Sequence, residues 1–182
     1  MSHLTLPVSD RDHIQGNPKA ALTLVEYGDY ECPYCGMAYP IVKRVQERLG
    51  KKLRFVFRNF PLNEIHPHAL HAAEAAEAVA QHGGEEAFWV MHDLIYEHQR
   101  DLSDAALARM ARQAGVDAEL VRGEVEEEQL KTRVRDDFMS GVKSGVNGTP
   151  TFFINGKRHD GPWDEVSLVM ALEATASAAA SA

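Results

Sequence analysis

The chain contains only two cysteines, and this scarcity limits what its sulfur chemistry can be. With no third cysteine, the one intramolecular disulfide available joins Cys32 to Cys35. A framework of several structural disulfides is therefore excluded, and so is an internal relay to a second dithiol.

Long hydrophobic runs and basic runs are also missing. No stretch of about 18 or more apolar residues occurs, so the sequence predicts no transmembrane helix. No cluster of lysine and arginine occurs either, and the net charge is −8. An acidic protein is poorly suited to bind phosphate-rich surfaces. We therefore expect neither nucleic acid nor a membrane among its partners.

The first ten residues lack the pattern of a secretory leader, because no cationic stretch is followed by an apolar core. If residue 1 is the natural start, we expect a cytoplasmic protein. A leader removed from a longer precursor would instead make it periplasmic or secreted. The compartment matters because it sets the direction in which thiols and disulfides exchange.

What is present suits one domain, or one domain with a large insertion: 182 residues, 45% hydrophobic and 25% charged. Patterns of period two and period 3.6 predict the elements. In chain order they are an extended arm (1–20), a buried strand (21–28), a helix from Pro33 to Gly50, a strand (53–58), successive helices (66–144), a hairpin (151–159) and a final helix that carries Val166 and Leu172.

This order predicts an α/β protein with a thioredoxin-like fold and an inserted all-helical domain. Residues 1–62 and 146–176 would form the thioredoxin-like core with its N-terminal arm, and residues 63–145 would form the insertion. Residues 177–182 are low in complexity, and we expect a disordered tail there.

The motif Cys32-Pro33-Tyr34-Cys35 lies where the strand pattern gives way to the helix pattern. Pro33 suits the first turn of a helix, which places Cys32 at the N-cap. Unpaired backbone N–H groups and the positive end of the helix dipole would stabilise a thiolate there. Cys35, one turn later, would be the more buried, resolving thiol. The alternative is an ordinary pair of buried cysteines.

A metal site is a second alternative, because CxxC often supplies half of a zinc site. The only cluster of histidines is His66, His68 and His71. Histidines at the polar start of a helix are more often solvated than bound to metal, so we expect no metal and no organic cofactor. A metal site shared between two subunits is left open.

Thr149-Pro150 is the second functional element. Pro150 enters a strand although it lacks the N–H that a strand ladder needs, which indicates an edge or a special geometry. A cis bond would expose the Thr149 backbone beside Cys32, where an extended substrate peptide would pair with it. The alternative is a trans proline in an ordinary turn.

Three acidic residues lie near the motif. Glu26 lies in the apolar strand six residues before Cys32, and it would exchange a proton with Cys35. An end-of-strand position with ordinary solvation is the alternative. Asp29 and Glu31 would oppose a thiolate, so we expect both to point to solvent. Tyr34, between the cysteines, would tune the redox potential.

With these residues in place, the chain resembles the DsbA-like family of thioredoxin-fold oxidoreductases. The resemblance is carried by Val-Glu-Tyr-Gly-Asp-Tyr-Glu-Cys-Pro-Tyr-Cys (25–35), by Gly-Thr-Pro-Thr-Phe-Phe-Ile-Asn-Gly (148–156), and by the helical stretch from His66 to His92. It spans about residues 7 to 173. It implies that Cys32 is the nucleophile, Cys35 its partner, Pro150 a cis-proline and Glu26 a buried acid.

The sequence therefore predicts an enzyme, a thiol–disulfide oxidoreductase, acting on protein or small-molecule thiols with Thr149, Pro33 and Tyr34 at the substrate. A glutathione or thioredoxin system is an expected partner. Two alternatives stay open. One is a peptide-binding or chaperone module that uses the groove beside Pro150. The other is a glutathione-dependent isomerase or transferase of the same fold, although those enzymes typically have serine in place of the first cysteine.

Overall fold

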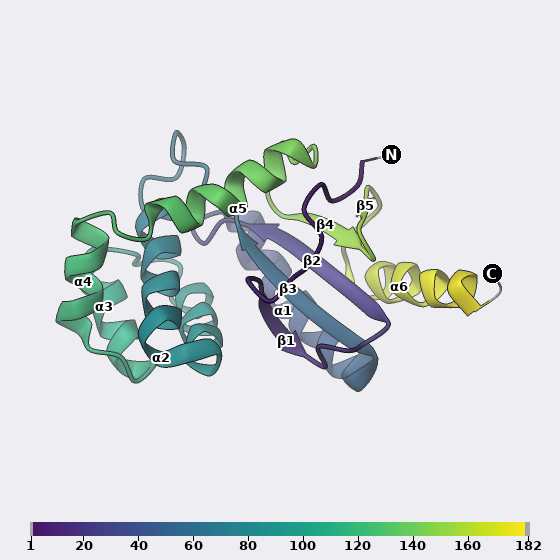
Figure 1. Ribbon diagram of the computed structural model, residues 1–182, viewed down its shortest axis with the longest axis horizontal. Helices are drawn as coiled ribbons and strands as arrows, with labels where there is room; N and C mark the ends of the chain where they lie inside the picture. Colours follow the sequence, from purple (N-terminus) through teal and green to yellow (C-terminus); the bar gives the residue numbers. More distant parts are fainter. Residues whose placement is uncertain (1, 181–182) are drawn as a thin grey trace.

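The computed structural model describes the backbone of residues 2–180 and the side chains of residues 2–176. A five-stranded sheet lies at the centre of the molecule, and a group of helices projects from one end of it (Figure 1). This is the thioredoxin-like fold with inserted helices that the sequence predicts. The predicted disordered tail, 177–182, lies outside the described side chains and, at 181–182, outside the described backbone, so it stays a prediction.

The strands run in the order β1-β3-β2-β4-β5 across the sheet. Their bounds are β1 His13–Gly16, β2 Leu22–Gly28, β3 Leu53–Asn59, β4 Thr151–Ile154 and β5 Lys157–His159. The helices are α1 Pro33–Leu49, the 3-10 turn η1 Gly50–Lys52, α2 Ala69–Glu97, α3 Asp104–Gln113, α4 Ala118–Glu126, α5 Lys131–Lys143 and α6 Glu165–Ala180. The exact limits of the two predicted domains, at 62/63 and 145/146, stay a prediction.

The central strand β2 is parallel to β3 and antiparallel to β4. All seven of its residues are buried, as its nearly continuous apolar run predicts for a strand covered on both faces. Because α1 connects β2 to β3, the start of α1 lies at the end of the central strand. The fold therefore places the CxxC motif at the carboxyl end of its most protected strand.

The two faces of the sheet are covered differently. Side chains such as Leu24 and Phe55 belong to the large core that α1, α2 and α6 complete. Their neighbours Val25 and Val56 belong to a smaller cluster on the other face, which Leu4, Val8 and Phe138 cover. This alternation follows from the period of two in a strand. By the same period Glu26 shares the face of Leu24, so it points to the α1 side.

The N-terminal arm, residues 2–16, does more than extend over the sheet, because it reaches both edges. Near its start, His3 forms a bridge with Lys157 in β5. At its end, residues 13–16 form β1 and pair antiparallel with β3, a strand that the sequence analysis did not assign. In between, the buried guanidinium of Arg58 donates to the carboxylate of Asp12 and to the carbonyl oxygen of Leu6. The arm is therefore fixed along its length.

Two of the inserted helices begin at side-chain caps. The Ser103 side chain accepts a hydrogen bond from the third residue of α3, and the Asp117 side chain accepts two at the start of α4. α2 has a kink at Gly84, which has φ +79° and ψ −172° inside the helix.

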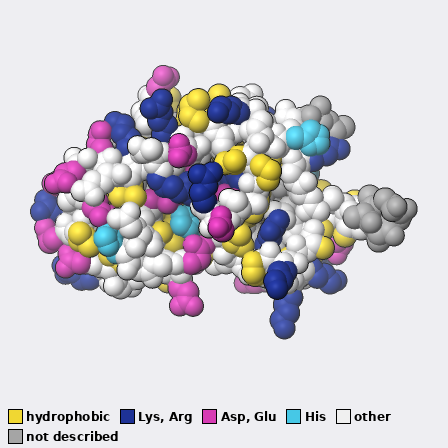
Figure 2. All heavy atoms as spheres, viewed as in Figure 1, with side chains coloured by type: hydrophobic (Ala, Val, Ile, Leu, Met, Phe, Trp, Pro, Cys, Tyr) yellow, Lys and Arg dark blue, Asp and Glu magenta, His cyan; other side chains and the backbone are white. Residues whose placement is uncertain are grey.

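Acidic side chains gather at the end of the molecule that α2, α3 and α4 form (Figure 2). Residues 63–145 contain 17 Asp and Glu against 8 Lys and Arg, so the insertion carries the negative net charge of the chain. The acidity that disfavours phosphate-rich partners is therefore a property of the inserted helices and not of the thioredoxin-like core.

Candidate active site

Cys32 and Cys35 lie at the start of α1, in the arrangement that the sequence predicts. Cys32 is the N-cap, with an extended backbone (φ −67°, ψ 122°), and Pro33 begins the helix. The Gly36 N–H donates to the Cys32 carbonyl oxygen at 3.0 Å, which closes the first turn. Cys32 is 4% exposed and Cys35 is fully buried. Both sulfurs are free thiols.

The surroundings of Cys32 favour its thiolate. The Cys35 thiol donates to the Cys32 sulfur, the Thr149 side chain and the backbone N–H groups of Cys35 and Tyr34 donate as well, and together they outweigh burial. These contacts lower the pKa of Cys32 to about 5. A sulfur at an N-cap collects the N–H donors that the first helical turn leaves unpaired. At neutral pH Cys32 is therefore mainly a thiolate.

Cys35 has the opposite environment. Burial raises the pKa of its thiol, and the hydrogen bond to Cys32 and the charge of Glu26 act in the same direction. The Asp29 N–H, which donates to the Cys35 sulfur at 3.4 Å, only partly offsets this. The pair thus combines one acidic thiol with one that keeps its proton.

Thr149 and Pro150 lie beside this pair, joined by a cis peptide bond, as the sequence predicts. The Cys32 thiol donates to the Thr149 carbonyl oxygen at 3.5 Å. The Thr149 hydroxyl is buried and has no other hydrogen-bond partner among the described residues, so it is free to donate to the thiolate. Thr149 therefore contacts the sulfur in both of its protonation states.

Glu26 is fully inside the protein, and the alternative of ordinary solvation at a strand end is wrong. Its residue is 3% exposed on the central strand, and its Oε1 atom has no partner within the described part of the chain. Burial, followed by the negative charge of Cys32, raises its pKa to about 8. A small cavity between β2 and α1 lies next to it, lined also by Tyr39, Lys43 and Gln46. Glu26 is thus a protonated acid near neutral pH.

The expectation that Asp29 points to solvent is wrong. Asp29 is 1% exposed, and its carboxylate accepts from the backbone N–H groups of Glu31 and Leu62, each at 2.8 Å. Its Oδ2 atom is also 2.8 Å from Nδ1 of His66. A short carboxylate satisfies the N–H groups of a tight turn, and that reason outweighs its repulsion of the thiolate. Asp29 organises the loop between β2 and α1.

The three histidines of the considered metal site point to separate partners. His66 pairs with Asp29, and His71 pairs with Asp104 at 2.7 Å. His68 is joined through its backbone N–H to the Glu31 carboxylate, so Glu31 also has a protein partner instead of pointing only to solvent. Among the side chains that the structure describes, no group of three or more His, Cys, Asp and Glu residues is placed to hold a metal ion.

Two predicted substrate residues flank the sulfur at the surface. Pro33 is exposed, and the Tyr34 side chain is 62% exposed. Met37, one turn further along α1, is 59% exposed. These side chains give Cys32 an apolar surrounding that is open to another molecule, although the sulfur itself is mostly covered.

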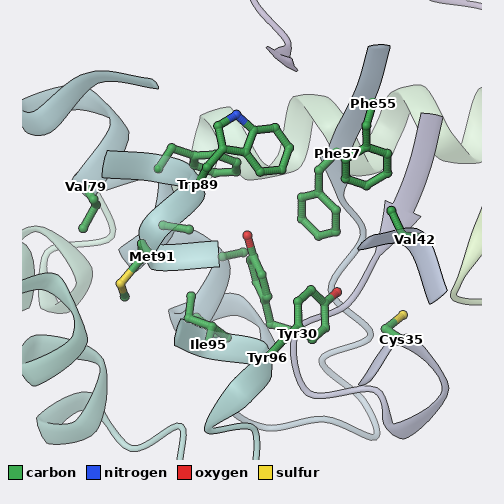
Figure 3. Close-up of a cluster of buried hydrophobic side chains, with 14 of the residues drawn as sticks. Tyr30, Cys35, Val42, Phe55, Phe57, Val79, Trp89, Met91, Ile95 and Tyr96 are labelled. Atoms are coloured by element: carbon green, nitrogen blue, oxygen red, sulfur yellow. The ribbon is translucent and has the colours of Figure 1, made fainter. Parts of the chain in front are cut away.

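The end of α2 packs against the motif, which the sequence analysis did not foresee. Tyr96 stacks on Tyr39 of α1 with ring centroids 5.2 Å apart, and it also contacts Tyr30 just before Cys32. The Tyr30 hydroxyl is 3.0 Å from Nδ1 of the buried His92, whose pKa is lowered by burial and then by the charges of Lys43 and His13. Figure 3 shows the Tyr30 and Tyr96 rings next to each other, between Ile95 of α2 and Cys35 of α1.

Gln99, two residues after α2, makes a further contact that no local pattern indicates. Its Nε2 atom donates to the carbonyl oxygens of Tyr30 and Cys32, at 2.8 Å each. The inserted helices therefore touch the reactive loop directly. Spacing between residues 32 and 99 gives no signal of this kind, since the contact depends on the packing of α2 against α1.

The comparison with protein families agrees with this geometry. A family model described as thioredoxin matches residues 9–174, almost the whole chain. The chain belongs to the thioredoxin family. Its inserted helices give it the form of the fold that α-DsbA2 from Wolbachia pipientis has, with a TM-score of 0.79 at 20% identity, covering 92% of this chain and 88% of that one.

Several solved structures share the complete fold. BdbD from Bacillus subtilis superimposes with a TM-score of 0.84 at 24% identity, covering 94% of this chain and 96% of its own. A thioredoxin-like oxidoreductase from Silicibacter pomeroyi gives 0.79 at 27% identity, covering 93% and 94%. MdbA, a thiol-disulfide oxidoreductase from Corynebacterium diphtheriae, gives 0.71 at 21% identity, covering 93% and 92%. The helical insertion is therefore a shared part of this architecture.

The curated proteins with similar sequences are named as Na(+)/H(+) antiporters. A Na(+)/H(+) antiporter NhaA 1 from a Mycobacterium species is 45% identical over 174 residues, which cover 94% of this chain but 28% of that protein. A Na(+)/H(+) antiporter NhaA from Herminiimonas arsenicoxydans is 38% identical over 164 residues, 90% of this chain and 25% of that protein. The chain thus spans about a quarter of the length of these relatives. Residues 2–180 form no helix that is long and apolar enough to cross a bilayer.

Proposed function

We propose that the protein is a thiol–disulfide oxidoreductase that exchanges disulfides with protein or small-molecule thiols through Cys32 and Cys35. The observation that carries this proposal is the contrast between the two sulfurs. Contacts at the start of α1 lower the pKa of Cys32 to about 5, while burial raises that of Cys35. Cys32 would therefore attack a substrate disulfide, and Cys35 would attack the resulting mixed disulfide.

In the reductive direction, the Cys32 thiolate attacks one sulfur of a substrate disulfide. A bond forms between Cys32 and that sulfur, and the second substrate sulfur leaves as a thiolate that takes a proton from solvent. Cys35 then loses its proton and attacks the Cys32 sulfur, which releases the first substrate sulfur as a thiol. The substrate gains two electrons, and the Cys32–Cys35 dithiol becomes a disulfide. The oxidative direction reverses these steps.

Two further residues have roles in this exchange. Glu26 accepts the proton from Cys35 in its ionised form and returns it in its protonated form, because it is buried behind the pair and its pKa of about 8 allows both forms near neutral pH. Thr149 presents its backbone beside Cys32, where an extended substrate would pair with it while the substrate sulfur meets Cys32. Pro33 and Tyr34 would contact the substrate on the other side.

The antiport activity in the name of the curated relatives is said of those longer proteins, and we do not propose it for this chain. Glutathione or a thioredoxin system as the electron partner is part of our proposal. The cytoplasm as its compartment stays a prediction. A reducing compartment would keep the dithiol reduced unless its potential is high, so the net direction follows from both quantities.

Trapping of the mixed disulfide tests the proposal. A Cys35→Ser variant retains the attacking sulfur but has no resolving thiol, so incubation with a disulfide-bonded peptide should yield a stable adduct of one peptide per protein. Cys32→Ser is the matched control and should form none. Intact mass before and after reduction measures both. An unmodified Cys35→Ser protein at pH 7 would contradict the proposal.

The same pair of variants separates the enzyme from the peptide-binding alternative. A binding module that uses the groove beside Pro150 would keep its affinity for a reduced peptide in both variants, and the wild type would not turn over insulin disulfides. We expect turnover in the wild type and none in Cys32→Ser, measured by the rate of insulin precipitation.

A further inference from the structure

The contact between Gln99 and the reactive loop has a simple geometry. One side-chain nitrogen donates to two backbone carbonyl oxygens, those of Tyr30 and Cys32, both at 2.8 Å. These carbonyl groups bracket Glu31, so the two hydrogens of one amide group fix the backbone immediately before the reactive residue. A bridge between carbonyls two residues apart restrains all the dihedral angles between them.

The two Gln99 hydrogen bonds restrain the Cys32 backbone, whose conformation sets the direction of the sulfur. The Cys32 sulfur is stabilised as an anion by donors whose directions are set by α1, among them the N–H groups of Tyr34 and Cys35. The sulfur meets these donors only if the Cys32 backbone keeps its N-cap conformation. Gln99 supports that conformation from outside the helix, through the same carbonyl group that accepts the Gly36 N–H at 3.0 Å.

The partial positive charge of the Gln99 amide hydrogens also favours the Cys32 thiolate. Two carbonyl oxygens beside a thiolate place partial negative charge close to it, which raises its energy. An amide N–H donor on each of them offsets part of that charge. The titratable groups that act on Cys32 and Cys35 include the two thiols themselves, Glu26 on β2 and Tyr96 on α2. Gln99 is neutral, so its contribution does not change with pH.

A second feature shows that the neighbouring turn accommodates this amide. A Cβ atom built at Gly36 would lie 2.3 Å from Oε1 of Gln99 and 3.0 Å from its Cδ. Any residue larger than glycine at position 36 therefore displaces the Gln99 side chain. The absence of a side chain at position 36 and the presence of an amide at position 99 are parts of one contact.

We propose that Gln99 is a positioning residue for the reaction: through its two hydrogen bonds, the inserted helical domain holds the Cys32 backbone in the conformation that makes the sulfur a nucleophile. This inference rests on the proposed function of the dithiol, and it assigns to the insertion a part in tuning the reactive thiol. Neither the sequence motifs nor the pattern of α2 indicates that part.

The first test is the pH profile of Cys32 alkylation by iodoacetamide in the Cys35→Ser background, so that only one thiol reacts. Gln99→Leu removes both donors, and we expect the midpoint of the profile to rise by about one pH unit. Gln99→Glu replaces donors with a negative charge and should raise it further. Gln99→Lys restores donors and adds a positive charge, so its midpoint should lie at or below that of the parent. Gln113→Leu, at the exposed end of α3, is the control and should leave the midpoint unchanged.

The second test uses Gly36→Ala, which displaces the Gln99 amide without touching it chemically. Alanine inside a helix is more favourable than glycine by about 1 kcal/mol, so helix stability does not account for a loss of function. We expect the alkylation midpoint to rise in the Gly36→Ala protein. In a Gln99→Ala background, where the space beside position 36 is free, the same substitution should have no further effect. The double-mutant cycle thus isolates the contact.

The possible results are distinct. An ordinary thiol midpoint for Cys32 in the wild-type protein, which keeps the Cys35 donor, overturns the proposed function. A low midpoint in the parent that stays equally low in Gln99→Leu and Gln99→Glu overturns only the positioning role. Additive effects of Gly36→Ala and Gln99→Ala overturn the view that the two positions form one contact.

Discussion

At the scale of single residues, the reactive loop is held mainly by bonds between side chains and the main chain. The Asp29 carboxylate accepts from the N–H groups of Glu31 and Leu62, and the Gln99 amide donates to two carbonyl groups. Such bonds fix backbone conformation directly, whereas a pair of flexible side chains fixes only itself. The direction of the Cys32 sulfur therefore depends on residues that take no part in the exchange of sulfur atoms.

The buried acid gives the first prediction, for Glu26→Gln in the reduced protein. Because the folded protein holds a proton that the unfolded chain releases, the Glu26 contribution to stability is complete below its unfolded pKa and is lost as the pH rises through about 8. We expect wild type to lose on the order of 3 kcal/mol relative to the variant between pH 5 and pH 9. Urea unfolding at a series of pH values measures this.

Cys32 contributes a slope of the opposite sign. Its folded pKa of about 5 is depressed, so its stabilisation is present above the unfolded thiol pKa and is lost as the pH falls through about 5. This slope is common to wild type and variant, and the difference between their curves reports Glu26. Parallel curves from pH 5 to pH 9 would show that Glu26 does not titrate in this range.

The sequence predicts the residues that carry the chemistry and misses those that arrange them. Cys32, Cys35 and Pro150 have rare local patterns, and Glu26 is unusual as an acid within an apolar strand. The expectation that Asp29 points to solvent is wrong, because its hydrogen bonds from the N–H groups of the turn outweigh its repulsion of the thiolate. Gln99 is 67 positions from Cys32, and only the packing of α2 on α1 brings them together.

At the scale of helices and strands, local sequence signals explain where most of these elements begin or end. Ser103 and Asp117 cap helices through their side chains, and the Asn155-Gly156 turn has the positive φ angles of a tight hairpin, 45° and 83°. The missed strand, β1, has only four residues and little alternation of polar and apolar side chains. It forms because its backbone pairs with the edge of β3. Pairing of this kind is decided by the partner strand and not by the segment itself.

The kink in α2 gives the second prediction, in which two glycines are compared. Gly84 has φ +79°, so Gly84→Ala should cost about 1 kcal/mol although nothing lies within 4 Å of the new Cβ. Gly123 lies inside α4 with equal space and no positive φ, so Gly123→Ala should stabilise by up to about 1 kcal/mol. Urea midpoints of the two variants should shift in opposite directions. A gain for both would show that residue 84 tolerates a regular helical conformation.

At the scale of the whole molecule, a buried polar cluster joins the arm, the sheet and the insertion. His13 of β1 lies between two carboxylates of α2, with Nε2 3.1 Å from Glu77 and Nδ1 2.9 Å from Glu85. Glu77 also accepts from Asn59 of β3 and pairs with Arg133 of α5 at 3.4 Å. Residues of β1, β3, α2 and α5 therefore meet at the Glu77 carboxylate.

This cluster gives the third prediction, for His13→Gln. Burial lowers the pKa of His13, but hydrogen bonds and charges from Glu77 and Glu85 outweigh it and raise the value to about 9. Its stabilisation is therefore complete below the unfolded pKa and is lost as the pH rises through about 9. Between pH 7 and pH 10, wild type should lose on the order of 2 kcal/mol that the variant does not lose. Thermal unfolding across this range measures the effect, with His98→Gln at the exposed end of α2 as the control.

The N-terminal arm that reaches both edges of the sheet has a consequence for behaviour in concentrated solution. On the outer side of β5, the Arg158 N–H donates to the Ser2 carbonyl oxygen of the arm. On the outer side of β1, the Ile14 N–H donates to the Glu85 carboxylate. Outer strands with unsatisfied backbone groups recruit other polypeptides and start aggregates. Here these outward N–H groups on both flanks already have partners in the same chain, which disfavours pairing with the polypeptides whose disulfides we propose the protein exchanges.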